Sequence, residues 1–339
     1  MQEAEKETQR LHPWVAEGLQ KVRAGISIMG LEEGWKHYLD TILLAEKLGF
    51  DSYWLPDHPM FSPDFGTNLA ALAVTTSTIR LGTLVSCVFY RNPVVLARIA
   101  ADIDRLSGGR FILGLGIGDI PFEFSQMGIP FLSTKERQRA LEETIQVLKG
   151  IWGTEPFTYK GKYVQVEQCS LPNGPVQQPH VPLLIAGGGE RVTLRQVAQY
   201  ADACNFGPHI WTGSASSIED VVRKCNALGA HCETFKRPVD SVLRTHLTIP
   251  LVLGETTSAV DAKLAAIPPM TREMFRSGEV ALTPAEAIEY YGVLVQAGMQ
   301  YFIVAVSPGD VETMLLFGQH VLPALTMMVP SVGTQIRVN

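Results

Sequence analysis

A short Asp-His pair between two prolines is the first candidate for chemistry in this chain. Asp57 and His58 stand between Pro56 and Pro59, just after an apolar run at residues 52–55. Histidine is the side chain best suited to move protons near neutral pH. A histidine in so tight a turn could equally hydrogen-bond the backbone, which leaves a structural role open. Asp57 fits an orienting or loop-capping role better than that of a proton carrier.

A second candidate lies where the apolar run at residues 111–115 ends in glycines. Gly114, Gly116 and Gly118 lack the Cβ atom that would hold the backbone away from a flat or phosphorylated ligand. Asp119 follows directly, and a solvated helix cap is one role open to it. The glycines predict part of a cofactor site.

A third candidate is the run Gly187, Gly188 and Gly189, which precedes a helix expected over residues 190–201. Backbone N–H groups at a helix start can hold a phosphate through direct hydrogen bonds and the helix dipole. Arg191 could add a charge-assisted contact. Glycines before a helix are also ordinary turn formers, so this alternative stays open.

Apolar strands and amphipathic helices must position these groups, and they alternate along the whole chain. Such alternation requires a parallel sheet, and eight units suffice to close a barrel, so we expect an α/β fold of the (β/α)8 TIM-barrel type. A doubly wound open sheet is the leading alternative. We prefer the barrel because the count reaches eight and no G-x-G-x-x-G motif directly follows the first strand. The predicted strands cover residues 22–29, 52–55, 79–88, 111–115, 182–186, 203–206, 244–252 and 301–306, and the helices residues 33–48, 67–76, 93–107, 135–151, 190–201, 215–229, 284–297 and 309–322.

Three segments interrupt the alternation, and none of them divides the chain. Residues 152–181 mix turn residues with a short alternating run, which predicts a small hairpin or flap. Residues 254–283 contain a proline pair that breaks any long helix. Insertions of this length are usually lids or interface elements. Residues 1–21 read as a surface extension, and residues 1–339 as a single domain.

Composition excludes several classes of protein. Of the 339 residues, 46% are hydrophobic and 18% charged, a soluble globular balance. A net charge of -6 argues against non-specific nucleic-acid binding. No apolar run reaches the roughly 18 residues of a membrane span, and the charged amino terminus has no signal core behind it. We therefore expect a cytoplasmic protein with a small-molecule substrate.

The cysteines indicate neither a disulfide framework nor a metal site. There are five, scattered along the chain and without a C-x-x-C pair. An odd number at such spacing fits buried free thiols better than zinc ligands or disulfides. No metal is expected.

The order and spacing of several motifs resemble the bacterial luciferase-like flavin and deazaflavin oxidoreductases, which are (β/α)8 barrels. The resemblance covers nearly the whole chain, although it separates the branches of the superfamily poorly. The motifs are G-F-D-S-Y-W-L-P-D-H, L-G-T-L-V with R-N-P, S-G-G-R-F-I-L-G-L-G-I-G-D, E-F-x-x-M-G-I-P-F, P-L-L-I-A-G-G-G and a final Y-F-I-V.

The resemblance assigns catalytic roles to residues of this chain. His58 resembles the base beside the reactive ring carbon in the branch that uses the deazaflavin F420. Asp119 stands where a sugar-phosphate dehydrogenase of that branch has a glutamate that handles the proton at a ring nitrogen, and Asp119 is shorter than that glutamate. Asp57 belongs to the same motif as His58.

Cofactor contacts are also implied. Leu84-Val85 matches a pair that often forms a cis peptide, a bulge on which the tricyclic ring rests, whereas the residues alone fit an ordinary buried strand. The position of the triple glycine binds the cofactor phosphate in relatives. Basic groups that could meet the anionic tail of F420 are Lys160, Lys162, Arg191 and Arg195, and candidates for a substrate entrance are Tyr90, Arg91, Asn92, Trp211, Met270 and Phe275.

The leading functional hypothesis is an F420-dependent oxidoreductase that transfers a hydride between F420 and a small organic substrate. The alternative is an FMN-dependent monooxygenase that uses reduced flavin and O2. Ile117 stands where bacterial luciferase has a phosphate-binding arginine, which weakens the FMN hypothesis. No lysine follows Gly207 at the place that holds substrate phosphate in the glucose-6-phosphate dehydrogenases, so a sugar phosphate is not expected. A third hypothesis is a flavin-binding relative without turnover, against which the Asp-His motif argues. We also expect a homodimer.

Overall fold

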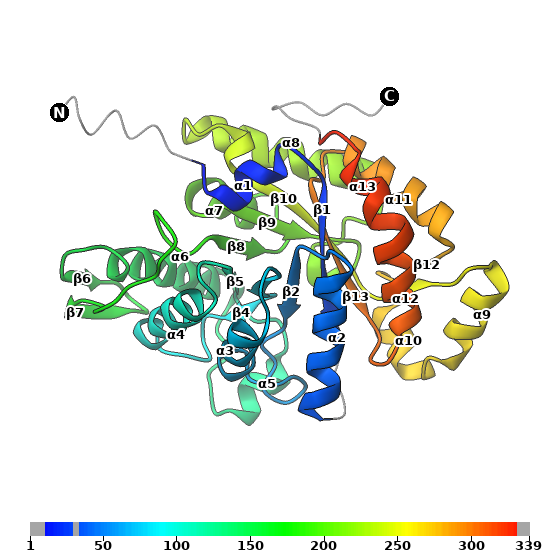
Figure 1. Ribbon diagram of the computed structural model, residues 1–339. Coiled ribbons are helices and arrows are strands. Elements are labelled where there is room, and N and C mark those ends of the chain that lie inside the picture. Colours follow the sequence, from blue (N-terminus) through cyan, green and yellow to red (C-terminus); the bar gives the residue numbers. More distant parts are fainter. Residues whose placement is uncertain (1–10, 30–33, 331–339) are drawn as a thin grey trace.

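The structure, a computed structural model, describes residues 11–29 and 34–330 and forms a closed barrel of eight parallel strands (Figure 1). Pairing of the first strand with the last, and of Leu81 with Phe111, completes the ring. This confirms the predicted (β/α)8 fold and excludes the open sheet. In barrel order the strands are β1 (Arg23–Ile28), β2 (Ser52–Leu55), β3 (Arg80–Thr83), β5 (Phe111–Gly116), β8 (Leu183–Ala186), β9 (Ala203–Phe206), β10 (Leu243–Thr248) and β13 (Tyr301–Val306).

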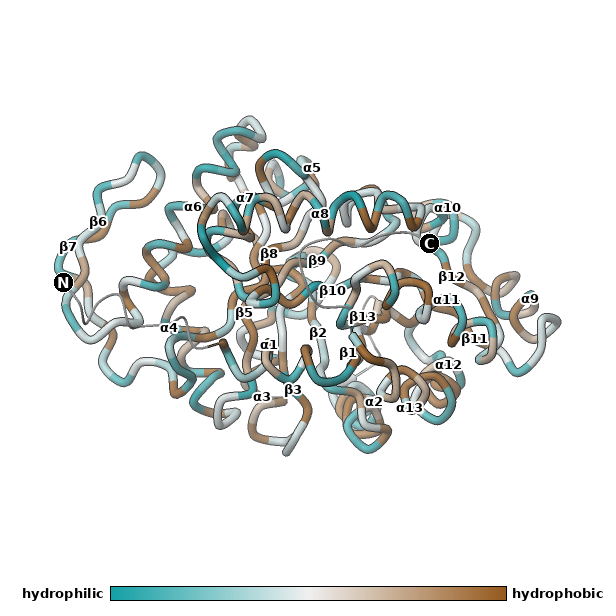
Figure 2. The backbone as a smooth tube through the Cα atoms, turned by 90° about the horizontal axis from the view of Figure 1, so that it is seen from above, coloured by the Kyte–Doolittle hydropathy of each residue, from teal (hydrophilic) through white to brown (hydrophobic). Residues whose placement is uncertain are grey.

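Helices surround the barrel, as the view from above shows (Figure 2). Strands buried on both faces need apolar side chains inside and outside the ring, which explains their continuous apolar runs. Inside the ring, Trp54, Ile112, Leu184 and Ile303 pack together. The outer helices are α2 (Trp35–Lys47), α3 (Phe65–Thr75), α4 (Pro93–Leu106), α6 (Thr134–Ile151), α7 (Thr193–Tyr200), α8 (Ile218–Thr234), α11 (Pro284–Gln296) and α12 (Val311–Leu316), the last continued by a π turn at Phe317–Val321 and by α13 (Leu322–Thr326).

The segment before the first strand closes the amino-terminal end of the barrel. Its helix α1 (Pro13–Gly18) buries Trp14, whose ring lies 6.2 Å from that of Trp54 and 5.8 Å from that of Tyr301. The prediction of a surface extension is therefore wrong for the described part of this segment, because an apolar plug is needed where the barrel interior would otherwise meet water. The first ten residues lie outside the described part.

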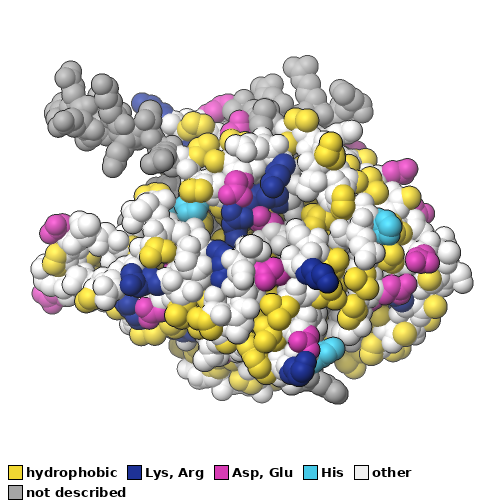
Figure 3. Space-filling view, viewed as in Figure 1, with side chains coloured by type: hydrophobic (Ala, Val, Ile, Leu, Met, Phe, Trp, Pro, Cys, Tyr) yellow, Lys and Arg dark blue, Asp and Glu magenta, His cyan; other side chains and the backbone are white. Residues whose placement is uncertain are grey.

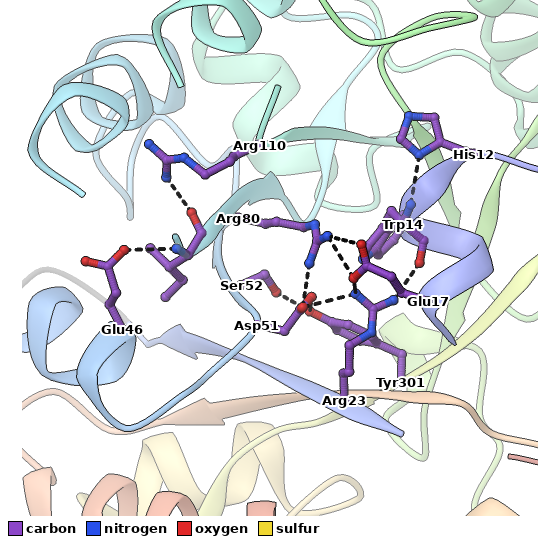
Figure 4. A network of polar contacts seen from close by, with 11 residues as sticks. His12, Trp14, Glu17, Arg23, Glu46, Asp51, Ser52, Arg80, Arg110 and Tyr301 are labelled. Atoms are coloured by element: carbon purple, nitrogen blue, oxygen red, sulfur yellow. Dashed lines mark hydrogen bonds and ion pairs between the residues drawn. The ribbon is translucent and has the colours of Figure 1, made fainter. Parts of the chain in front are cut away.

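A network of charges joins α1 to the strands at the same end (Figure 4). Arg23 donates to Glu17 at 2.9 Å and to Asp51 at 3.0 Å. Arg80 also binds both carboxylates, and the Tyr301 hydroxyl donates to Asp51 at 2.8 Å. Mutual pairing offsets the cost of removing these ions from water. The network thus links the first and last strands.

The chain between β3 and the short strand β4 (Ser86–Cys87) bulges into the barrel, and the glycines of β5 make room for it. The Leu84–Val85 peptide bond is cis. A Cβ atom on Gly114 would collide with the Thr83 carbonyl, and one on Gly116 would lie 2.5 Å from a Val85 methyl. These two glycines therefore seat the bulge, whereas the sequence suggested that they approach a ligand directly.

The insertions form the elements that interrupt the repeat. Residues 152–181 contain the predicted hairpin, β6 (Phe157–Lys160) antiparallel to β7 (Gln165–Cys169). Residues 254–283 contain α9 (Thr257–Ala266) and α10 (Pro269–Phe275), and β12 (Val280–Leu282) pairs with β11 (Leu251–Leu253) outside the barrel. Shorter elements are α5 (Pro121–Gln126), η1 (Ile210–Thr212) and η2 (Val239–Ser241).

Acidic and basic side chains are interspersed over the face that Figure 3 shows, without a continuous basic patch there. Across residues 11–29 and 34–330, no helix is long and apolar enough to cross a membrane. The same residues include no group of His, Cys, Asp and Glu side chains that could hold a metal ion.

Replacing Gly114 with alanine should destabilise the fold by about 2 kcal/mol or more, because the new methyl group would collide with backbone that cannot move away. Urea unfolding followed by circular dichroism measures this. Gly292→Ala, inside helix α11, is the matched control. Its Cβ atom would lie 3.4 Å from Met328, an ordinary contact, so the substitution should be neutral or stabilising. Equal stability of the Gly114→Ala and wild-type proteins would refute the seating role of Gly114.

Candidate active site

A buried carboxylate holds His58 at the carboxyl-terminal end of β2. The His58 Nδ1 atom lies 2.8 Å from Oε2 of Glu123, and the side chain of His58 is 34% exposed whereas that of Glu123 is fully buried. The Tyr90 hydroxyl donates to the same carboxylate oxygen at 3.0 Å. Burial raises the pKa of Tyr90, so this phenol stays protonated and remains a donor. Glu123 therefore fixes the orientation of the imidazole.

Glu123 begins the E-F-x-x-M-G-I-P-F motif, but no role in the site was predicted for it from the sequence. It lies on α5, directly after the glycine-rich end of β5, and is separated from His58 by 65 positions in the chain. The available signal was one acidic residue within the apolar run P-F-E-F. A carboxylate so placed must be either exposed or paired inside. Tyr90, suggested as an entrance residue, lines a neighbouring pocket and also contacts this pair.

Asp57 faces away from His58 and ties neighbouring segments together. Its carboxylate accepts hydrogen bonds from Arg91 at 2.6 Å, from the Ser86 hydroxyl at 3.1 Å and from the Cys87 amide at 3.2 Å. Burial raises the pKa of Asp57, and the Arg91 guanidinium opposes that rise. These contacts join the turn after β2 to Ser86, Cys87 and Arg91.

Two further groups near the His58 turn, Asp119 and Cys87, have a raised pKa. Asp119 does not cap α5, whose N-cap residue is Ile120, and although part of Asp119 reaches the surface its carboxyl group lies among the residues around His58. Partial desolvation raises the pKa of the Asp119 carboxyl group, while the nearby His58 opposes the rise. Burial raises the pKa of the Cys87 thiol to about 12, so this thiol stays protonated and is a poor nucleophile.

The cis bond between Leu84 and Val85 confirms the conformation that the resemblance implied. Both side chains are half-buried and pack against the inner core of the barrel. Leu84 and Val85 together form a shelf at the carboxyl-terminal rim, where the Leu84 amide donates to the Leu55 carbonyl oxygen at the end of β2, three residues before His58. A flat ring system could rest on this shelf.

The triple glycine lies further from a helix start than the sequence suggested. Helix α7 begins at Thr193 rather than near residue 190. Gly187 has a φ of 118°, which only glycine adopts readily. A Cβ atom on Gly188 would lie 2.9 Å from the Gly213 carbonyl oxygen, so close packing requires glycine there. Gly189 alone reaches the pocket described next.

A pocket of about 650 Å³ lies between the amino-terminal parts of α6 and α7. Lys135, Arg139 and Arg191 line it, and among the described residues they have no acidic partner. Basic side chains without partners beside a helix start favour an anionic ligand. The other lining residues are Thr134, Gln138, Glu142, Gly189, Glu190, Val192, Thr193 and Gln196.

Several other residues suggested by the sequence lie around the His58 loop and the pocket between α6 and α7. Gly116 ends β5 against Val85, and Gly118 lies in the loop that leads to Asp119. Arg91 is held by Asp57 and Asp64, and Asn92 caps α4 by accepting from the Val94 amide. Of the suggested tail contacts, Lys162 and Arg195 lie within 4.0 Å of glutamates, at 3.7 Å and 4.0 Å.

Known proteins share both the sequence pattern and the fold. The family model for luciferase-like monooxygenases matches residues 18–300. An F420-dependent glucose-6-phosphate dehydrogenase of Intrasporangium calvum is 31% identical over 340 residues, covering 87% of this chain and 99% of that protein.

Two solved structures are similar in fold. The F420-dependent tetrahydromethanopterin reductase of Methanopyrus kandleri superposes with a TM-score of 0.76 at 22% identity, covering 90% of this chain and 99% of that one. An F420-dependent secondary alcohol dehydrogenase gives a TM-score of 0.76 at 20% identity with the same coverage. By its sequence match over most of its length, the chain belongs to the luciferase-like monooxygenase family.

Proposed function

We propose that the protein is an F420-dependent oxidoreductase that transfers a hydride between F420 and a small organic substrate. The observation that carries this proposal is the His58–Glu123 pair beside the Leu84–Val85 shelf. It combines an oriented proton-transfer group with a surface for a flat ring. The names of the Intrasporangium relative and of both similar structures support the choice of cofactor.

The residues present suit a deazaflavin cofactor with an anionic tail. Leu84 and Val85 would support the ring, and the pocket between α6 and α7 would receive the phosphate and tail. Lys135, Arg139 and Arg191 would supply the positive charge there. When bound, F420 supplies a ring carbon that accepts or returns a hydride.

His58 would exchange the proton that accompanies hydride transfer. Its Nδ1 atom faces Glu123, so Nε2, which has no partner among the described residues, is the nitrogen left for a substrate. A carboxylate behind an imidazole holds one tautomer and stabilises the protonated ring. Glu123 is thus a positioning residue, and His58 the catalytic residue of the proposal.

An FMN-dependent monooxygenase is the competing assignment within the same fold, and fold alone does not separate the two. Ile117 lacks a charge for the FMN phosphate. The neighbouring Arg137 is engaged by the backbone carbonyls of Ile117 and Gly118. The proposal extends to a cytoplasmic homodimer, and the five free cysteines suit a reducing compartment.

The first test is cofactor choice. F420 should bind at least ten times more tightly than FMN, because the pocket between α6 and α7 offers three cations to a long anionic tail. Titration of the apo-protein, followed by cofactor fluorescence, measures both dissociation constants. Micromolar FMN affinity without an F420 response would favour the monooxygenase assignment.

The second test concerns the pair at the rim. His58→Ala should lower turnover by roughly 10²-fold or more with little change in cofactor affinity, the usual scale for losing a positioned proton-transfer group. Glu123→Gln should lower turnover by about tenfold, and combining both changes should add little to the loss from His58→Ala alone.

Steady-state rates and cofactor dissociation constants for the single and double variants measure this coupling. Tyr90→Phe is the milder control, since it removes one hydrogen bond to Glu123 and leaves the carboxylate in place. If the loss of turnover in the double variant equals the product of the two single losses, Glu123 does not act through His58. That result would contradict a positioning role for Glu123 and support a purely structural one.

The third test locates the anionic part of the cofactor. Arg191→Glu should weaken F420 binding by about tenfold or more, because a charge-assisted contact is replaced by repulsion. Arg105→Glu, an exposed change at the end of α4, is the matched control. If the two variants bind F420 equally well, the tail does not occupy the pocket between α6 and α7.

A further inference from the structure

We infer that the substrate is uncharged and largely apolar, an alcohol or the matching carbonyl compound, and not a sugar phosphate. This inference rests on the proposed hydride-transfer function and names its substrate class. It separates this chain from the glucose-6-phosphate dehydrogenases that it resembles in sequence.

The wall opposite His58 is built from aromatic rings. Strand β9 is four places from β2 in the ring of eight, so the loop after β9 faces His58 across the barrel mouth. There the buried His209 ring lies 4.4 Å from that of Trp211 and 5.8 Å from that of Phe275. Trp211 and Phe275 meet edge to face at 5.7 Å.

A hydrogen bond secures this wall to the insertion. The His209 Nε2 atom lies 2.9 Å from the Met274 carbonyl oxygen, which fixes α10 against the end of β9. Figure 1 places α10 at the same end of the barrel as α5, the helix that carries Glu123. The rings and α10 therefore form one side of the mouth that His58 faces from the other.

This wall exposes four large apolar side chains, beside the charged side chains of α10. Ile210 is 67% exposed, Trp211 44%, Met270 80% and Met274 52%. Large apolar groups gathered on one short helix and one adjoining loop usually mark a binding surface. Covering them with the hydrocarbon part of a substrate releases water and favours binding.

The cations of α9 and α10 are already neutralised. Lys263 pairs with Asp310 at 2.7 Å. Arg272 contacts both carboxylate oxygens of Glu279, at 3.1 and 3.2 Å, and Arg276 lies 3.3 Å from Glu273. A phosphate entering on this side would compete with a carboxylate for each of these cations.

Acidic groups on the His58 side of the mouth also disfavour a substrate that carries a phosphate. The carboxylates of Asp119 and Glu123 lie near His58, and a substrate phosphate there would be repelled. Arg91 cannot compensate because Asp57 and Asp64 already hold its guanidinium. An uncharged hydroxyl or carbonyl beside His58, with its carbon chain on the Trp211 wall, meets neither obstacle.

The step balances as an ordinary two-electron oxidation. The carbinol C–H bond breaks and its hydride passes to the oxidised deazaflavin, while the hydroxyl proton passes to His58 and the carbon–oxygen double bond forms. Reduction of the carbonyl compound reverses each transfer. No other reactant is needed.

The test uses the F420-loaded enzyme and a series of secondary alcohols from propan-2-ol to octan-2-ol. We expect kcat/KM to rise about two- to fourfold for each added methylene group, the range set by partial to complete burial of that group. Glucose-6-phosphate should be turned over at least 100-fold less efficiently than octan-2-ol. A flat series, or efficient use of glucose-6-phosphate, would overturn the inference and leave F420 dependence intact.

Variants and a binding measurement make the test independent of folding and of turnover. Met274→Ser alters the wall without touching the ring contacts, and Trp211→Ala removes the largest side chain of the wall. Both variants should lower kcat/KM for octan-2-ol by at least fivefold and so reduce the rise of kcat/KM with chain length. Met327→Ser, an exposed change after α13, should not.

Binding of octan-2-one to the apo-protein, followed by tryptophan fluorescence, should weaken in the same two wall variants. The ketone-binding measurement tests the substrate class even if F420 does not bind. Failure of F420 to bind would refute the proposed function and not the inference about the substrate. Unchanged ketone affinity in both wall variants would show that the hydrocarbon chain binds elsewhere.

Discussion

The active rim depends on one buried carboxylate that joins segments from separate parts of the chain. Asp57 accepts hydrogen bonds from the backbone and side chains that follow the cis bulge, and its ion pair with Arg91 continues to Asp64 at the start of α3. A buried ion without partners would be very costly, so the partners must assemble around it. The residue next to Asp57 is His58, whose position is thereby set by the same contacts.

The proton-transfer pair and the large exposed apolar side chains occupy different sides of the barrel mouth. The side formed by β2 and α5 carries His58 and Glu123, whereas the side formed by η1 and α10 carries Trp211 and its apolar neighbours. A third region, between α6 and α7, holds Lys135, Arg139 and Arg191, which have no acidic partner within residues 11–29 and 34–330. This division suits a reaction in which a proton, a carbon chain and an anionic cofactor each need a different environment.

Much of this arrangement could be predicted from the sequence, because it follows local patterns. The eight strands, the hairpin within residues 152–181 and the place of His58 follow from apolar periodicity and turn residues. The role of Glu123 could not be predicted, since its partner is 65 positions away and no local rule links them. Gly114 illustrates the same limit: its residue type indicated close approach, but only the fold identifies the Thr83 carbonyl as the approaching group.

The contacts at the amino-terminal end of the barrel have a consequence for synthesis. Strand β1 pairs with β13, and Tyr301 reaches Asp51 across 250 positions, so one edge of β1 has no native partner until almost the whole chain exists. At usual rates of translation this interval lasts tens of seconds. An unpaired apolar strand edge is a template for association with other chains. The growing protein would therefore leave that edge of β1 open to association with other chains until β13 has been synthesised.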